Sequence, residues 1–234
     1  PEHQLINENE EAALLFKETD SPLAAVAAGA GGFFGMISNA IASTRLYELV
    51  AGAGSVPYVV VINPGVRKEQ VAAIFGKALG WDAATQKMFA KLPPVSTDEL
   101  TEGTIAPGEY ALSDTASVVE VQTEVKNRFE ETVLSRYTED IQKIVPLRVG
   151  LTIASIIERE TSDPEEMRII SGIIWNRIFA DMKLQMDSTL QYAKATGKGP
   201  WWPQVVPRDK YINSPYNTYQ NEGLPPGPIS DPSV

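Results

Sequence analysis

Proline crowds the last part of this chain, where eight of its 17 prolines lie between residues 200 and 232. Proline has no backbone N–H and a fixed φ, so it is excluded from helix interiors and central strands. Glycine is frequent in the same stretch. We therefore expect residues 197–234 to form an ordered, irregular loop tail that packs on a body built by the preceding residues.

The preceding residues begin with the pattern of a small mixed module. A β-branched run at 58–62 ends at Asn63-Pro64-Gly65, which predicts a strand followed by a turn. Apolar residues at helical spacing predict a helix over 69–79, and a second short helix is expected over 83–92. Residues 109–112 are expected to form a second strand. Strand, two helices and strand make a small α+β module.

Three helices are expected after this module. Residues 115–144 read as one long amphipathic helix that ends before Pro146. Helices over 147–161 and 164–180 follow, and Asp163 and Pro164 are the expected N-cap and first residue of the latter. The predicted fold class is α+β. Its parts are an N-terminal segment (1–54, the remnant of an upstream region), the small module (55–125) and a mainly helical domain that ends in the loop tail (126–234).

Composition excludes several kinds of chemistry. The chain has no cysteine and one histidine, His3, which excludes disulfides, thiolate catalysis and Ser-His-Asp catalysis. No ligand cluster has the spacing of a metal site, so neither a metal nor another cofactor is expected. The net charge of -10, without a basic run, argues against nucleic acid as a partner. Chemistry must therefore come from carboxylates, amides, hydroxyls and the backbone.

The most informative segment is residues 154–161, with the sequence ASIIERET. On a helix at ~100° per residue, Ile153, Ile156 and Ile157 define an apolar arc that also contains Glu160. Glu158 falls outside the arc, so we expect it to face solvent while Glu160 faces the interior or a cleft. A carboxyl group held against apolar neighbours stays protonated more readily, because burial disfavours its charged form. Cleavage of a glycosidic bond requires such an acid.

Helix geometry alone leaves a purely structural alternative open for Glu160. The residue would then be a buried glutamate tied to an arginine, with no role in catalysis. The candidate partners are Arg148, Arg168 and Arg177.

Two later segments carry polar and aromatic side chains suited to a sugar site. Residues 183–189 and Tyr192 offer short polar groups that could bind hydroxyls and amides, or simply form a capped turn with Asp187 or Ser188 as N-cap. Residues 213–219 hold aromatic rings and amides in a stiff Pro-rich loop. Trp201 and Trp202 could extend a cleft, or could be buried as part of a structural tail.

Taken together and in this order, these segments resemble the YceG-like (MltG-type) family of endolytic murein transglycosylases. The matching residues are 154–161, Asn176-Arg177, Met182, Leu184-Gln185, Asp187, Thr189, 214–219 and 223–229. Upstream, the Val-rich strand, Pro64-Gly65, Glu102-Gly103 and 107–110 also match. The resemblance covers roughly residues 43–234. Ser188 stands where relatives usually have proline.

The resemblance implies that Glu160 is the catalytic acid/base. Protonated Glu160 would protonate the glycosidic oxygen between MurNAc and GlcNAc, and its carboxylate would then deprotonate the C6 hydroxyl of the same MurNAc, closing a 1,6-anhydro ring. If Asp187 faced Glu160 across room for a water, a hydrolytic muramidase reaction would become possible instead. The implied substrate-binding residues are Asn176, Gln185, Asp187, Thr189, Tyr216, Asn217 and Tyr219.

The resemblance also implies a setting for the reaction. Residues 55–125 would be a LysM-like glycan-binding subdomain and 126–234 the catalytic domain, short of its C-terminal end. The partners would be peptidoglycan glycan strands and the cell-wall synthesis machinery. An extracytoplasmic, membrane-associated location is implied, with the anchor upstream, because residues 22–42 are too rich in glycine for a good membrane span. The alternative is a non-catalytic glycan-binding scaffold.

Overall fold

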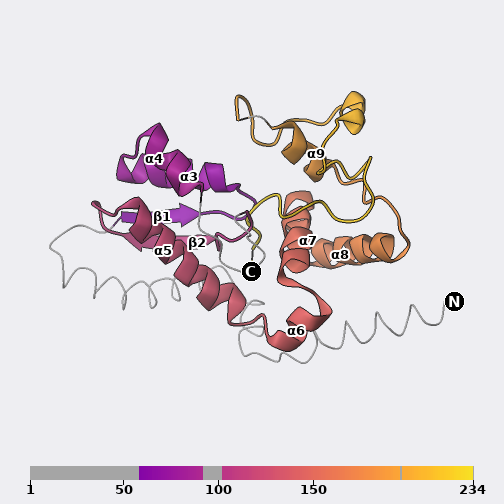
Figure 1. The fold of residues 1–234 in the computed structure, drawn as a ribbon, viewed down its shortest axis with the longest axis horizontal. Helices are drawn as coiled ribbons and strands as arrows, with labels where there is room; N and C mark the ends of the chain where they lie inside the picture. Colours follow the sequence, from indigo (N-terminus) through magenta and orange to yellow (C-terminus); the bar gives the residue numbers. More distant parts are fainter. Residues whose placement is uncertain (1–57, 92–101, 196, 234) are drawn as a thin grey trace. The chain divides into compact units, whose positions relative to one another are not determined.

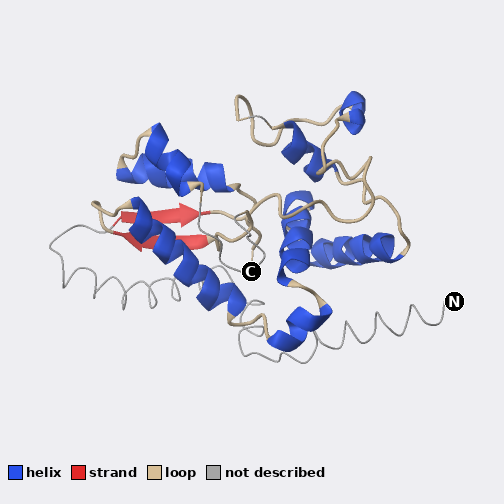
Figure 2. Ribbon diagram, in the orientation of Figure 1, coloured by secondary structure: helices blue, strands red, loops and turns tan. Residues whose placement is uncertain are grey.

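A two-stranded antiparallel sheet begins the part of the chain that the computed structural model describes, residues 58–91, 102–195 and 197–233 (Figures 1 and 2). Strand β1 (Tyr58–Ile62) pairs with β2 (Gly108–Leu112), with Tyr58 opposite Leu112 and Ile62 opposite Gly108. Val60 and Ile62 are buried, whereas the alternate β1 residues are exposed. This alternation follows from the strand's period of two and leaves one face of the sheet for helices to cover.

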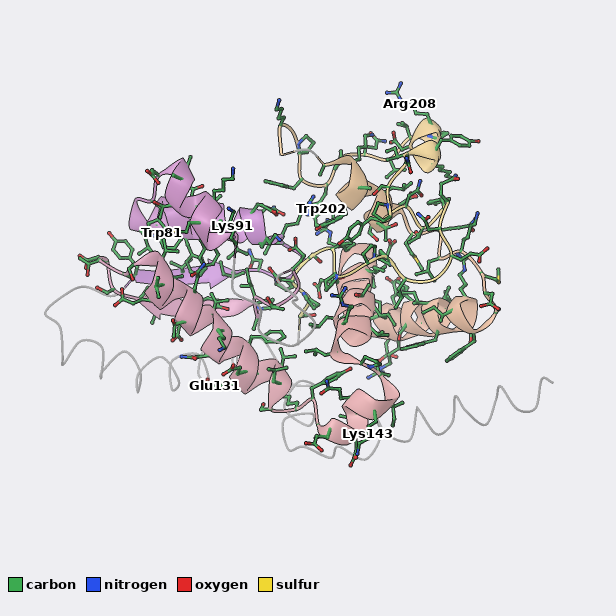
Figure 3. The ribbon with its side chains drawn as sticks, in the orientation of Figure 1. Trp81, Lys91, Glu131, Lys143, Trp202 and Arg208 are labelled. Atoms are coloured by element: carbon green, nitrogen blue, oxygen red, sulfur yellow. The ribbon has the colours of Figure 1, made fainter. Side chains whose placement is uncertain are left out.

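Helices α3 (Lys68–Leu79) and α5 (Val118–Phe129) contribute to the same core as the buried face of the sheet. The short helix α4 (Ala83–Phe89) closes this core with Phe89, whose ring lies 5.3 Å from that of Phe75. Trp81, which is labelled in Figure 3, also packs near both phenylalanine rings, with centroids 6.3 Å from Phe75 and 5.6 Å from Phe89. The predicted strand, helix, helix and strand are confirmed, although α4 ends before residue 92.

The prediction of a single long helix over 115–144 is wrong. α5 ends at Phe129 and continues into a π-helical turn, η1 (Glu130–Leu134), and a separate helix α6 (Glu139–Ile144) follows. The apolar stripe ends at Val133, and Thr138 then caps a new helix by accepting a hydrogen bond from the Ile141 N–H. A side-chain cap inside the pattern was therefore the signal of a break.

Helices α7 (Leu147–Glu160) and α8 (Pro164–Phe179) confirm the two predicted helices and pack against one another. Their shared core contains Ile153, Ile156 and Ile174, together with Leu184 and Ile229 from later segments. Helix α9 (Asp187–Lys194) packs against α7 and is followed by a 3₁₀ turn, η2 (Pro207–Tyr211). The predicted cap of α8 is present, since the Asp163 carboxylate accepts from Glu165 N and Glu166 N.

The last described residues contact the turn that follows β1 and also contact α7. Asp231 exchanges backbone hydrogen bonds with Gly65 and Val66, at 2.7 and 2.8 Å. Ile229 N donates to the Ser155 hydroxyl at 3.0 Å. Gly103 makes this close approach possible, because its φ is +78° and a Cβ there would lie 2.6 Å from Pro228.

The predicted domain boundaries remain predictions. The N-terminal segment 1–54 lies outside the described residues. The boundary between 125 and 126 falls inside α5, whose Val125 belongs to the sheet core while Phe129 packs with Leu147 and Leu151. One helix therefore joins two cores. Among the helices of the described ranges, none is long and apolar enough to cross a membrane.

Candidate active site

Glu160 is the last residue of α7, and it is exposed. The apolar face of α7 is covered through Ile156, but Thr161 is extended and ends the helix just as its last turn leaves the core. Glu158 is half-buried, and its carboxylate accepts two hydrogen bonds from Ser233, from N at 2.9 Å and Oγ at 2.5 Å. The expectation that Glu158 faces solvent is therefore wrong, and Glu160 does not face the interior; that Glu160 faces a cleft stays a prediction.

The three arginines considered as partners of Glu160 each have another partner. Arg168 forms an ion pair with Glu165 at 2.6 Å. Arg177 donates to the backbone carbonyls of Lys183 and Leu184. Arg148 donates to the carbonyl of Pro226 at 2.7 Å. The structural alternative of a buried glutamate tied to one of these arginines does not describe the exposed Glu160 carboxylate.

The contact that the structure gives Glu160 is with the start of α9. Ser188 N donates to Glu160 Oε1 at 3.4 Å. The N-cap residue of α9, Met186, has no side-chain acceptor to offer the first turn, and Glu160 supplies one. A helix N-terminus favours negative charge through its free N–H groups and dipole. The position is therefore suited to the carboxylate that remains after an acid has given up its proton.

Asp187 and Tyr219 form a second polar pair at the same helix terminus. Tyr219 Oη donates to Asp187 Oδ1 at 2.8 Å. Desolvation, followed by the hydrogen bond to Asp187, raises the pKa of Tyr219 to about 12, and the charges of Asp187 and Glu160 act in the same direction. Tyr219 consequently stays a neutral donor near neutral pH.

Thr218 locks the start of α9 to the loop at 214–219. Its carbonyl accepts from Gln185 N at 3.1 Å, and its hydroxyl accepts from Met186 N at 3.0 Å. The Thr218 and Thr189 hydroxyls lie 2.8 Å apart. Gln185 has a φ of +53°, a left-handed conformation that is uncommon outside glycine and here turns the chain into α9.

Asn217 supports this loop from inside. The side chain is fully buried, and its amide donates to the carbonyls of Lys210 and Ile212 at 3.1 and 2.7 Å. Its Oδ1 accepts from Tyr219 N at 2.9 Å. Thr189 is also fully buried. Both residues were predicted to bind substrate, but their polar atoms are used to hold Asp187 and Tyr219 in place.

The other predicted binding residues, Tyr216, Gln185 and Asn176, differ in how they relate to the contacts at the start of α9. Tyr216 packs against Tyr192 with ring centroids 4.6 Å apart. Gln185 joins through its backbone, and its side chain is exposed. Asn176 is exposed on α8, where its carbonyl accepts from Ala180 N. The structure thus connects Glu160, Asp187, Thr189, Asn217 and Tyr219 through the start of α9 and leaves Asn176 outside these contacts.

Two arginines that the sequence did not single out lie on the aromatic side chains near α9. The Arg67 Cζ is 3.9 Å from the Tyr192 ring centroid. The Arg159 Cζ is 4.0 Å from that of Trp202, which is labelled in Figure 3. Trp201 and Trp202 are both half-buried. The sequence could have pointed to Arg159, because it lies inside the informative segment 154–161. It gave no such indication for Arg67, which only the fold brings to α9.

No metal site accompanies these groups in the described ranges, where no three histidine or acidic side chains come close enough to hold an ion. The groups gathered at Glu160 are instead a carboxylate, a helix N-terminus and a tyrosine–aspartate pair. This arrangement can give and take a proton and can offer hydrogen-bond donors and acceptors to hydroxyl groups.

Comparison with known proteins shows which family the chain is similar to. The family model for the YceG-like family matches residues 2–234. An endolytic murein transglycosylase of Bacillus subtilis is 26% identical over 222 residues, covering 86% of this chain and 60% of the relative. One from Streptococcus pneumoniae is 31% identical over 134 residues, covering 57% of this chain and 24% of the relative.

A solved structure has the same fold. The crystal structure of a yceG-like protein from Listeria monocytogenes superimposes with a TM-score of 0.65 at 27% identity, covering 75% of this chain and 64% of that one. The chain thus spans between a quarter and two thirds of the length of these relatives. With its match over residues 2–234, the chain belongs to the YceG-like family.

Proposed function

We propose that this protein is an endolytic peptidoglycan lytic transglycosylase whose acid/base is Glu160. The observation that carries the proposal is the position of Glu160, exposed at the end of α7 and in contact with the first turn of α9. The relatives named endolytic murein transglycosylases support the substrate class. The bond cleaved would be the β-1,4 bond between MurNAc and GlcNAc.

A single carboxyl group is sufficient for this reaction. Glu160 protonates the glycosidic oxygen as the bond to MurNAc C1 breaks, so that GlcNAc leaves with a hydroxyl. The Glu160 carboxylate, favoured by the start of α9, then accepts the proton of the MurNAc C6 hydroxyl as O6 bonds to C1. Glu160 is protonated again, water is not consumed, and the product carries a 1,6-anhydro end.

The Tyr219–Asp187 pair favours this reaction over hydrolysis. A muramidase would need a second carboxylate free to act on a water or on the sugar. Asp187 Oδ1 is instead occupied by the Tyr219 hydroxyl. Asp187, Tyr219 and the exposed Gln185 are the proposed sugar contacts, with Tyr216 behind them and Asn217 and Thr189 as supports.

The proposed setting follows from the same substrate. The module of β1, α3, α4 and β2 would bind glycan in the manner of a LysM-like subdomain. The protein would act outside the cytoplasm, associated with the membrane through an upstream anchor, and alongside the cell-wall synthesis machinery.

Product analysis tests the proposal. Peptidoglycan strands are incubated with the protein and with Glu160→Gln, and the new ends are identified by mass spectrometry. Anhydro-MurNAc ends that disappear with Glu160→Gln support the transglycosylase. Reducing ends would establish a muramidase. Binding of glycan without cleavage by either protein would establish the scaffold.

A further inference from the structure

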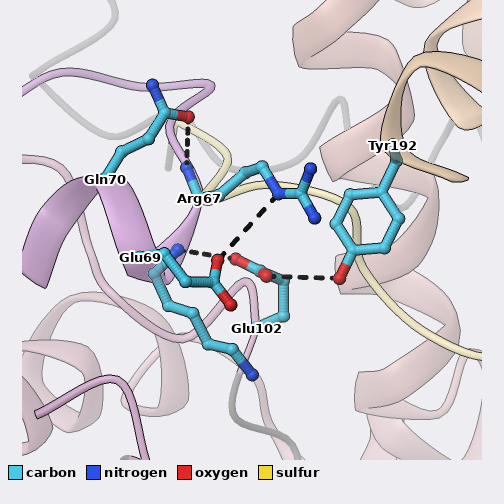
Figure 4. A network of polar contacts seen from close by, with 6 residues as sticks. Arg67, Glu69, Gln70, Glu102 and Tyr192 are labelled. Atoms are coloured by element: carbon cyan, nitrogen blue, oxygen red, sulfur yellow. Dashed lines mark hydrogen bonds and ion pairs between the residues drawn. The ribbon is translucent and has the colours of Figure 1, made fainter. Parts of the chain in front are cut away.

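Tyr192 connects α9 to the strand–helix module, here defined as β1, α3, α4 and β2. Its hydroxyl donates to Glu102 Oε2 at 3.3 Å, as Figure 4 shows. The Arg67 guanidinium lies across the face of its ring, with Cζ 3.9 Å from the centroid. A cation over an aromatic face and a hydrogen bond at the ring's far end fix both the position and the rotation of the side chain.

Glu102 is held equally firmly on the side of the module. It lies in the segment before β2 and is 7% exposed. Its Oε1 accepts from Lys68 N, at the first residue of α3, at 2.9 Å. The two carboxylate oxygens of Glu102 therefore join the start of α3 to α9 (Figure 4).

Helix α9 also contacts Glu160, one turn before Tyr192. Ser188, whose N–H donates to Glu160, is four residues before Tyr192, so both lie on one face of α9. A displacement of Tyr192 in so short a helix moves its first turn. We propose that Tyr192 and Glu102 are positioning residues that hold the start of α9 against Glu160 for the transglycosylase reaction, so the inference rests on the proposed function.

The hydrogen bond between Tyr192 and Glu102 should depend on pH. Desolvation raises the pKa of Glu102 to about 7, and burial also raises the pKa of Tyr192, which stays a donor. A hydrogen bond to an ionised carboxylate is roughly twice as strong as one to a neutral acceptor. The link should therefore tighten as pH rises through 7. The other charged or titratable groups around Glu102 and Tyr192 are Arg67, Lys68, Glu69, Tyr216 and Asp231.

Hydrogen exchange of the full chain tests this link without requiring activity. The variants are Tyr192→Phe, which keeps the ring and removes the hydroxyl, Glu102→Gln, and the double variant. Tyr211→Phe is the control, because Tyr211 is 81% exposed. We expect Tyr192→Phe to speed exchange in residues 187–194 about tenfold at about pH 8 and only about twofold at about pH 6, relative to wild type at the same pH.

The other variants complete the test. The double variant should exchange no faster than Tyr192→Phe, because both changes remove one interaction. Exchange in α3–α5 and in the Tyr211→Phe control should stay unchanged. Exchange in 187–194 that is unaffected by Tyr192→Phe, that rises equally at both pH values, or that rises equally in all helices would overturn the proposal.

Kinetics then connect the link to catalysis. We expect Tyr192→Phe and Glu102→Gln to lower kcat about five- to tenfold with little change in KM, and to remove an inflection of kcat near pH 7. An unchanged inflection would contradict the positioning role. If wild type cleaves no glycan, the proposed function fails, and the exchange result still decides whether Tyr192 and Glu102 hold α9.

Discussion

Ser155 and Ser188 are both buried near the proposed site, but their hydroxyl groups differ in what they contact. Ser155 Oγ donates to Thr152 O at 2.8 Å and accepts from Ile229 N at 3.0 Å. Among the described residues, Ser188 Oγ is buried without a hydrogen-bond partner, whereas the backbone N–H of Ser188 donates to Glu160. The two residues therefore provide a matched pair for substitution by alanine.

We expect Ser188→Ala to leave activity unchanged and stability unchanged or slightly higher, because it removes an unpaired buried hydroxyl and keeps the N–H. Ser155→Ala should cost about 1–3 kcal/mol, because it leaves Ile229 N without an acceptor. For a chain of this size, each kcal/mol of lost stability lowers Tm by roughly 2–4 °C, so thermal unfolding resolves the difference between the two variants. Equal Tm values for the two variants would contradict these contacts.

Tyr219 keeps Asp187 Oδ1 occupied, and removing its hydroxyl tests the proposal that this pair disfavours hydrolysis. Tyr219→Phe frees Asp187 Oδ1 and removes a neutral donor at the start of α9. We expect glycan cleavage to fall about tenfold, as for the loss of one positioned hydrogen bond. The assay should count reducing ends beside anhydro ends, because a freed Asp187 could admit a water. Full activity with anhydro ends alone would show that the pair plays no part.

At the scale of elements, the conformation of the loop at 207–219 depends on the hydrogen bonds of the buried Asn217 side chain. Asn217→Ala would leave the carbonyls of Lys210 and Ile212 and the N–H of Tyr219 without their partner. We expect a loss of about 2–4 kcal/mol in urea unfolding, together with faster hydrogen exchange in 207–219. Asn213→Ala, at an exposed position of the same loop, is the control and should change neither.

The elements differ in how far the sequence predicted them. Helix α7 follows Pro146 and has a clear apolar face, and α8 begins with the Asp163 cap and Pro164; both were predicted to within a residue or two. The prediction of one long helix was wrong because it extended the helix past Val133, where the apolar stripe ends, and overlooked Thr138 as the cap of a new helix. The helical wheel placed Glu160 on the apolar side but left the interior and a cleft as alternatives, because a helical wheel does not say where the covering core ends along the helix.

Contacts between distant segments lay beyond the reach of sequence reasoning. Glu102 and Tyr192 are 90 residues apart, and Ser155 meets residues 74 and 75 positions later. Such pairs depend on how loops fold back, for which composition and periodicity carry no signal. The resemblance pointed to Glu160, Asp187 and Tyr219, but it did not tell the supports Asn217 and Thr189 from residues available to sugar.

At the scale of the whole molecule, two buried carboxyl groups join segments that are distant in the sequence: Glu102 links α3 to α9, and Asp231 links the last described residues to the segment before β2. Asp231 is fully buried, and its Oδ1 accepts from Ile105 N at 3.0 Å. Burial and the neighbouring Glu102 raise the pKa of Asp231 well above its usual range, and burial raises that of Glu102 to about 7. Both groups therefore bind a proton more tightly in the folded protein than in the unfolded chain.

The sign of the resulting pH dependence follows from linkage. A carboxyl group with a raised folded pKa contributes stability that is fully present below its unfolded pKa and is lost as pH rises through the folded value. We expect Glu102 to reduce the free energy of unfolding by about 3 kcal/mol between about pH 4 and about pH 8. In urea unfolding, Glu102→Gln should flatten this decline. A slope as steep as that of wild type would contradict the buried, proton-binding Glu102.

The account depends most on Glu160, and the neighbouring Glu158 gives a matched control on the same helix. Glycan strands are incubated with wild type, Glu160→Gln and Glu158→Gln, and anhydro-MurNAc ends are counted by mass spectrometry. We expect Glu160→Gln to lower their rate of formation at least about a hundredfold, and Glu158→Gln, which alters the contacts with Ser233, to stay within a few-fold of wild type. Anhydro ends formed by Glu160→Gln at the wild-type rate would contradict Glu160 as the acid/base.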